Sequence, residues 1–202
     1  QLGVEGPEIR LDSLLQQVRE AVDHEVVLLE GIDAVLGPQH PAQVEPDAQR
    51  RRAYQILKDE LRNKRQAYVV YPLIEESEKT DLQAAIQGAE QLQNGECADF
   101  KVGLLHGRMK SAEKEAVMAA FKQGRIDVLV ATTVIEVGVD VPNASVMVIE
   151  NAERMGLAQL HQLRGRVGRG AQESSCVLLY RGPPSQIARA RLATIRDSHD
   201  GF

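Results

Sequence analysis

From residue 50 onward, short apolar runs alternate with segments whose apolar positions recur every three or four residues. A continuous apolar run bounded by polar residues predicts a buried strand, and spacing such as that of Leu82, Ile86 and Ala89 predicts a helix. The predicted strands are 67–71, 102–106, 127–132, 145–150 and 175–180. The predicted helices run from Asp47 through Leu61, around 82–89, and over 111–122, 157–163 and 185–196. This alternation indicates an α/β fold, a parallel sheet with helices on both faces.

In a sheet of this kind, ligands bind beyond the carboxyl ends of the strands. The loops that follow Tyr71, His106, Thr132 and Glu150 should therefore share one working edge.

Residues 1–49 have a different pattern. Apolar side chains at Leu11, Leu14, Leu15, Val18 and Val22 predict one amphipathic helix, with Asp12 or Ser13 as its cap. Residues 25–29 fit either a short strand or a continuation of that helix, and the Gly/Pro-rich stretch 37–46 predicts a linker. We therefore divide the chain into a mainly helical N-terminal extension or linker, 1–49, to which we assign no role, and an α/β domain, 50–202.

The charge distribution supports the same division. Residues 1–49 hold ten acidic and two basic side chains, a net charge of -8, whereas residues 50–202 hold nineteen acidic and twenty-two basic ones, a net charge of +3. Such an asymmetry is typical of two functionally different parts. A net charge of +3 is too small for strong binding to nucleic acid over the whole surface, so any such contact should be local.

Composition narrows the class of protein. Of the 202 residues, 43% are hydrophobic and 3% aromatic, so the core should consist of Val, Leu, Ile and Ala. We see no apolar run long enough to span a membrane and no charged-then-apolar leader at the N-terminus. Cys97 and Cys176 lie far apart with no Cys or His partners in a ligand pattern, which argues against a metal site and fits a reducing, cytoplasmic setting.

The clearest candidate for chemistry is the stretch 162–169, Gln-Leu-Arg-Gly-Arg-Val-Gly-Arg. An arginine stays charged at any physiological pH, and its planar fork of donors fits phosphate oxygens. An Arg/Gly stretch can also be a solvated loop. Hydrophobic segments on both sides favour an ordered one.

A second candidate follows the predicted strand 127–132. Thr132 and Thr133 can donate to phosphate oxygens at a strand end, Gly138 permits close approach of the backbone, and Asp140 can accept hydrogen bonds from a ribose. The alternative is that a threonine caps a helix and that 140–142 is only a turn.

A third candidate, His106-Gly107-Arg108, ends one strand and precedes the helix at Ser111. Alone, a His or Arg at a strand end is more often structural or solvated than functional.

In chain order, the stretches 106–108, 132–142 and 162–169 resemble motifs IVa, V and VI of superfamily 2 helicases. From about residue 66 onward, the chain most resembles the second motor lobe of RecG-type helicases, ATP-dependent enzymes that migrate branches in DNA. The stretches that carry this resemblance are 73–78, 106–110, 131–143, 150–154 and 156–161. Mfd-type translocases share 156–169, but 71–77 favours the RecG type.

The resemblance implies a RecA-like fold and a nucleotide-binding role. Arg166 and Arg169 would stabilise charge on the γ-phosphoryl group of ATP, and Gln162 would help to order the site. Gly138 and Asp140 would contact the nucleotide.

It also implies that His106, Gly107, Arg108, Thr132 and Thr133 contact the nucleic-acid backbone. The implied substrate is branched or forked DNA, as at replication forks and recombination intermediates, and the implied setting is DNA repair and recombination in the cytoplasm.

Two elements of such a motor are missing from the sequence. The chain contains no Gly-Lys pair and hence no Walker A motif, and Asp59-Glu60 lies in a predicted helix instead of at the strand end that a Walker B motif requires. We expect a P-loop lobe, absent from this chain, to hold most of the ATP and its Mg²⁺, so the chain alone should be inactive. No metal site is expected within it.

Three alternatives stay open at this point. The first is a non-catalytic binding module derived from a helicase lobe, and the second is the equivalent lobe of an Mfd-like translocase. The third is an unrelated doubly wound domain with an Arg/Gly loop, whose strand order would differ from the RecA core.

Overall fold

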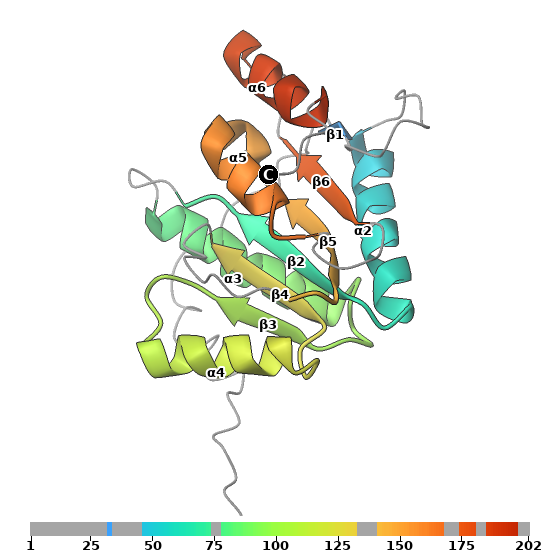
Figure 1. The fold of residues 1–202 in the computed structure, drawn as a ribbon, viewed down its shortest axis with the longest axis vertical. Helices are drawn as coiled ribbons and strands as arrows, with labels where there is room; N and C mark the ends of the chain where they lie inside the picture. Colours follow the sequence, from blue (N-terminus) through green and yellow to red (C-terminus); the bar gives the residue numbers. More distant parts are fainter. Residues whose placement is uncertain are drawn as a thin grey trace, which may run out of the picture.

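The computed structural model describes residues 32–33, 46–73, 78–132, 141–167, 174–180 and 185–197. The described strands form one six-stranded sheet in the order β1-β6-β5-β2-β4-β3 (Figure 1). The strands are β1 (Ile32–Asp33), β2 (Gln66–Tyr71), β3 (Val102–Leu105), β4 (Val128–Thr132), β5 (Ala144–Ile149) and β6 (Ser175–Leu179). The helices are α2 (Pro46–Arg62), α3 (Glu78–Asn94), α4 (Ser111–Lys122), the short 3-10 helix η2 (Ala152–Arg154), α5 (Leu157–Arg164) and α6 (Gln186–Asp197).

The strands from β2 to β6 are parallel, as the continuous apolar runs predict. β2 lies at the centre, paired with β4 on one side and β5 on the other. Every residue of β2, β3, β4 and β5 is buried, because helices cover both faces of the sheet. β1 is the exception in direction: it pairs antiparallel with β6 at the sheet edge, with Ile32 opposite Leu179.

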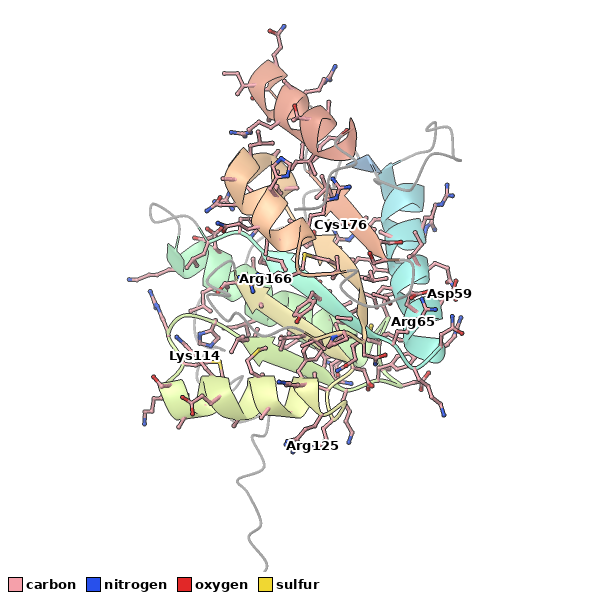
Figure 2. All side chains as sticks on the ribbon, in the orientation of Figure 1. Asp59, Arg65, Lys114, Arg125, Arg166 and Cys176 are labelled. Atoms are coloured by element: carbon pink, nitrogen blue, oxygen red, sulfur yellow. The ribbon has the colours of Figure 1, made fainter. Side chains whose placement is uncertain are left out.

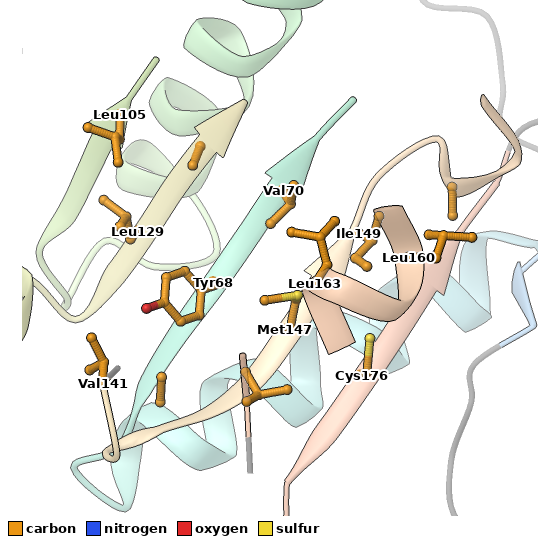
Figure 3. Close-up of a cluster of buried hydrophobic side chains, with 14 of the residues drawn as sticks. Tyr68, Val70, Leu105, Leu129, Val141, Met147, Ile149, Leu160, Leu163 and Cys176 are labelled. Carbon is orange, nitrogen blue, oxygen red and sulfur yellow. The ribbon is translucent and has the colours of Figure 1, made fainter. Parts of the chain in front are cut away.

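Helices on the two faces bury two separate apolar clusters. On one face, α2 and α3 cover the cluster that contains Leu57, Val69 and Val130. On the other face, α4, α5 and α6 cover the cluster that contains Phe121 and Leu160, part of which Figure 3 shows. Figure 1 shows α4 beside β3 at one end of the strand order, and α5 and α6 towards β5 and β6 at the other.

The predicted elements from Asp47 onward are confirmed, most with shifts of only a residue or two at their ends. The predicted helix 111–122 coincides with α4, and Gly124 ends it in a left-handed conformation with φ +70°. No described helix has both the length and the apolar character needed to cross a bilayer.

Most of the N-terminal part, including the predicted helix at 11–22 and the run 25–29, lies outside the described residues. The described β1 adds a short strand to the main sheet, and α2 begins at Pro46. The boundary between residues 49 and 50 stays a prediction.

Candidate functional site

The carboxyl ends of the parallel strands bring three predicted positions to one edge. Tyr71 at the end of β2 pairs in register with Thr132 at the end of β4, and Leu105 of β3 pairs with Ala131. His106, the next residue, therefore follows its strand at the level of Thr132. The sheet itself thus places two predicted nucleic-acid contacts at neighbouring strand ends.

His106 begins a tight turn into α4. Its backbone N–H donates to Met109 Sδ at 3.4 Å, and its carbonyl accepts from the backbone N–H of Met109 at 3.2 Å. The helix then starts at Ser111, with the backbone N–H of Lys110 donating to Glu113 Oε2 at 3.0 Å. These contacts fix the strand-to-helix connection, and Gly107 and Arg108 within it are exposed.

The imidazole of His106 is only 8% exposed, and its Nδ1 has no hydrogen-bond partner among the described residues. Burial, together with the positive charges of Lys114 and Arg108, lowers the pKa of His106 below its ordinary value of 6.5. The ring is therefore neutral at physiological pH, with one N–H donor and one acceptor nitrogen.

Thr132 is 1% exposed, and its Oγ1 is likewise without a partner in the described part of the chain. Buried polar atoms are nearly always hydrogen bonded, so these two atoms are exceptions within the described residues. Two such atoms therefore lie at neighbouring strand ends, both enclosed by the protein.

The end of α5 presents the arginine stretch. Leu160, Leu163 and Val167 are buried in the core cluster, whereas Gln162 is exposed and Arg166 is half-buried. The backbone N–H of Arg166 donates to the Leu163 carbonyl at 3.0 Å, which closes the last turn. The anchored apolar side chains therefore hold Arg166 towards the carboxyl ends of the strands, where Figure 2 shows it.

The structure adds two details to this stretch. Gly165 has φ -67° in the right-handed helical region, so the turn at this glycine uses no conformation closed to other residues. Arg164 donates to the backbone carbonyl of Ile195 at 3.1 Å, which joins α5 to α6. Arg164 thus contributes to docking of the helices.

Thr133, Gly138, Asp140 and Arg169 lie outside the described residues.

A buried polar cluster that the sequence analysis missed lies where β5 ends. Glu150 is 5% exposed and accepts two hydrogen bonds from Arg50 of α2, at 2.7 and 3.1 Å. The hydroxyl of Tyr54 donates to the same carboxylate at 2.6 Å. Burial, followed by the negative charge of Glu150, raises the pKa of Tyr54 well above its ordinary value, which keeps this hydroxyl protonated as the donor.

A second ion pair lies four residues further along the chain. Arg154 of η2 donates to both carboxylate oxygens of Asp81 in α3, at 2.6 and 3.4 Å, and Asp81 is 3% exposed. The partners of the two pairs are separated by 100 and 73 residues, so no local spacing signals them.

Across the described ranges, no cluster of His, Cys, Asp and Glu side chains could hold a metal ion. The described part of the site can bind oxygens and anions through hydrogen bonds and arginine charge.

Comparison with known proteins identifies a matching family and similar helicases. Residues 50–171 match the family described as the helicase conserved C-terminal domain. The ATP-dependent DNA helicase RecG of Escherichia coli K12 is 66% identical over 138 residues, which is 68% of this chain and 20% of that protein. The RecG of Acidithiobacillus ferridurans is 57% identical over 173 residues, or 85% of this chain and 25% of that protein. The chain thus spans about a fifth to a quarter of the length of these relatives.

Among solved structures, RecG bound to a three-way DNA junction is similar with a TM-score of 0.64 and 46% identity, over 82% of this chain and 22% of that one. The yeast DEAD-box splicing factor Prp28 shares the fold, with a TM-score of 0.58 at 22% identity over 74% of this chain and 31% of that one. Together these matches favour the RecG type over an Mfd-like lobe or an unrelated doubly wound domain. The chain belongs to the family of helicase conserved C-terminal domains, and within that family it is a RecA-like C-terminal lobe of the RecG type.

Proposed function

We propose that this lobe is the C-terminal motor half of an ATP-dependent DNA helicase that acts on branched DNA. The observation that carries the proposal is the end of α5, where buried Leu163 and Val167 anchor the turn that carries half-buried Arg166. The proposal is supported by the relatives, which are named ATP-dependent DNA helicases, and by the similar RecG structure bound to a three-way DNA junction.

On the nucleotide side, Arg166 and Arg169 stabilise negative charge that develops on the γ-phosphoryl group of ATP, and Gln162 helps to order the site. Gly138 and Asp140 contact the nucleotide. An arginine with this role contributes about 10³ to 10⁵ in turnover in other phosphoryl-transfer enzymes. ATP itself is bound mainly by a separate lobe that carries a P-loop, since this sequence has no Walker A motif. Mg²⁺ is held mainly by that same lobe, bound together with the phosphates of ATP.

On the DNA side, His106, Gly107, Arg108, Thr132 and Thr133 contact the sugar–phosphate backbone. The register of β2, β4 and β3 supports this assignment, because it brings His106 and Thr132 to neighbouring strand ends at the carboxyl edge, where ligands bind in such sheets. Backbone contacts carry no sequence information, so binding is independent of base sequence. Opening and closing of the cleft between the two lobes would move these contacts along the strand. We place this activity in DNA repair and recombination in the cytoplasm.

The test uses the full-length enzyme that contains this lobe. Arg166→Ala and Arg169→Ala should each lower the kcat of ATP hydrolysis on forked DNA by roughly 10³-fold or more, since each removes charge stabilisation in the transition state. Binding of forked DNA should change little.

Arg125→Ala is the matched control. Arg125 is exposed, follows α4 near the amino ends of the strands, and hydrogen bonds to Gln123. Its removal should leave kcat unchanged. Normal turnover in both Arg166→Ala and Arg169→Ala would contradict the proposed function and favour a non-catalytic binding module.

A further inference from the structure

The segment from Glu150 to Arg154 lies at the crossing between the two faces of the sheet. It leaves β5 at the carboxyl edge and leads, through Met155 and Gly156, into α5. Asn151 has a left-handed conformation, φ 49° and ψ 44°, and reverses the chain where the strand ends. We call residues 150–154 the crossover segment.

Both charged ends of the crossover segment are held by helices of the opposite face from α5. Glu150 binds Arg50 in α2, and Arg154 binds Asp81 in α3. Within the segment, the backbone N–H of Arg154 donates to the Asn151 carbonyl at 3.0 Å, so η2 forms one compact turn. A displacement of Arg154 would therefore turn the whole segment.

The pair of Arg154 and Asp81 is built for precise placement. A fork of two hydrogen bonds, at 2.6 and 3.4 Å, fixes the orientation of the guanidinium plane as well as its distance. Asp81 lies in the first turns of α3, where the helix dipole favours a negative charge, and it is 3% exposed. Because the carboxylate is buried, loss of the arginine would remove a charged partner from a desolvated negative charge and destabilise the lobe.

The connection to the arginine stretch is short. Met155 is 1% exposed, and the backbone N–H of Gly156 donates to Gln159 Oε1 at 3.0 Å, which starts α5. Arg166 follows two residues after the end of this eight-residue helix. A small rotation of η2 would thus be passed through one rigid helix to Arg166.

We propose that Asp81 and Arg154 are positioning residues, which orient α5 and thereby set where Arg166 meets the nucleotide. This inference rests on the proposed function and deepens it. Neither residue touches the reacting atoms. Their contribution is the geometry of the arginine, and a misplacement of about 1 Å at such a site can cost roughly 10²-fold in rate.

The test measures ATP hydrolysis by the full-length enzyme at saturating forked DNA for Asp81→Asn, Arg154→Gln and the double variant. Each single change should lower kcat by roughly 10- to 100-fold with KM for ATP unchanged, the pattern of an interaction that acts in the transition state. The kcat of the double variant should be no lower than that of the less active single variant, because both changes remove the same interaction. Arg154→Lys keeps the positive charge on a flexible side chain but loses the fork of donors, so the variant should fold and still have a low kcat.

The matched control is the ion pair of Arg65 and Glu60, which has the same length of 2.6 Å but lies beside the amino end of β2. Figure 2 shows Arg65 at the opposite side of the sheet from Arg166. Glu60→Gln and Arg65→Gln should lower Tm without lowering the kcat of the folded enzyme.

Two outcomes would overturn the inference. One is normal kcat in folded Asp81→Asn and Arg154→Lys while Arg166→Ala is inactive; this would leave the proposed function intact. The other is additive losses in the double variant. Normal kcat in Arg166→Ala and Arg169→Ala would instead remove the proposed function, and this inference with it.

Discussion

At the scale of single residues, His106 makes the free energy of unfolding of the lobe depend on pH. Burial and the nearby positive charges of Lys114 and Arg108 lower its pKa in the folded lobe below the ordinary 6.5. As the pH falls through 6.5, the unfolded chain therefore takes up a proton before the folded one does. The stability contributed by neutral His106 is present above that pH and is lost below it.

We expect His106→Asn to weaken this dependence. Between about pH 7.5 and pH 5, the free energy of unfolding should fall less steeply with decreasing pH in the variant than in the unchanged protein, as measured by urea denaturation. Equal slopes in the two proteins would show that His106 is as easily protonated in the folded state as in the unfolded one.

At the scale of elements, Gly88 explains how α3 packs on the sheet. A Cβ at this position would lie 2.0 Å from the hydroxyl oxygen of Tyr71 and 2.6 Å from its Cζ. Tyr71 is buried at the end of β2, and both residues line a pocket of about 310 Å³ between α2 and α3. The glycine therefore lowers the helix propensity of α3, but it leaves space for the aromatic side chain of Tyr71.

Gly88→Ala should destabilise the lobe by about 1 to 3 kcal/mol, since the clash exceeds the gain in helix propensity. The loss should shrink in a Tyr71→Leu background, where the ring is absent. Gly165→Ala is the control: its Cβ would make an ordinary contact of 3.5 Å, so its effect on the free energy of unfolding should be small. Destabilisation by Gly88→Ala that is the same in both backgrounds would contradict the role of Tyr71.

Helices and strands could be predicted from the sequence, whereas contacts between residues far apart in the chain could not. The apolar run of β2 and the spacing of α4 carry their own signal, because burial of a strand or a helix face depends on residues close together in the chain. The ion pair of Asp81 and Arg154 carries no such signal, since its partners meet only after the sheet has assembled.

For the candidate site, the sequence predicted the edge and the positions of His106 and Thr132. It did not predict that both would be buried with unpaired atoms, which depends on packing around the strand ends.

At the scale of the whole molecule, one buried cysteine lies on each face of the sheet, so the reactivity of each thiol can show when its face unfolds. Cys97 belongs to the cluster under α2 and α3, and Cys176 to the cluster under α4, α5 and α6. Burial raises the pKa of Cys97 to about 11 and that of Cys176 to about 12. Because the thiolate is the reactive form, both side chains are inert while the lobe is folded.

In the single-thiol variants Cys97→Ala and Cys176→Ala, the remaining thiol should react with a disulfide reagent only as urea unfolds the lobe. If the two faces open together, the two variants should give the same midpoint for labelling as for the loss of helical circular dichroism. Rapid labelling of either thiol without denaturant, or labelling midpoints below that of the helices, would contradict this cooperative behaviour.

The place of β2 in the sheet has a consequence for synthesis on the ribosome. Of the described parallel strands it is made first, yet its partners β4 and β5 come later, and the second of them ends only at Ile149. Until that residue has emerged, the nascent chain carries an apolar strand without both neighbours, the kind of segment that aggregates or engages chaperones. Late completion of the sheet, rather than formation of any single helix, is therefore the step on which productive folding of a newly made lobe depends.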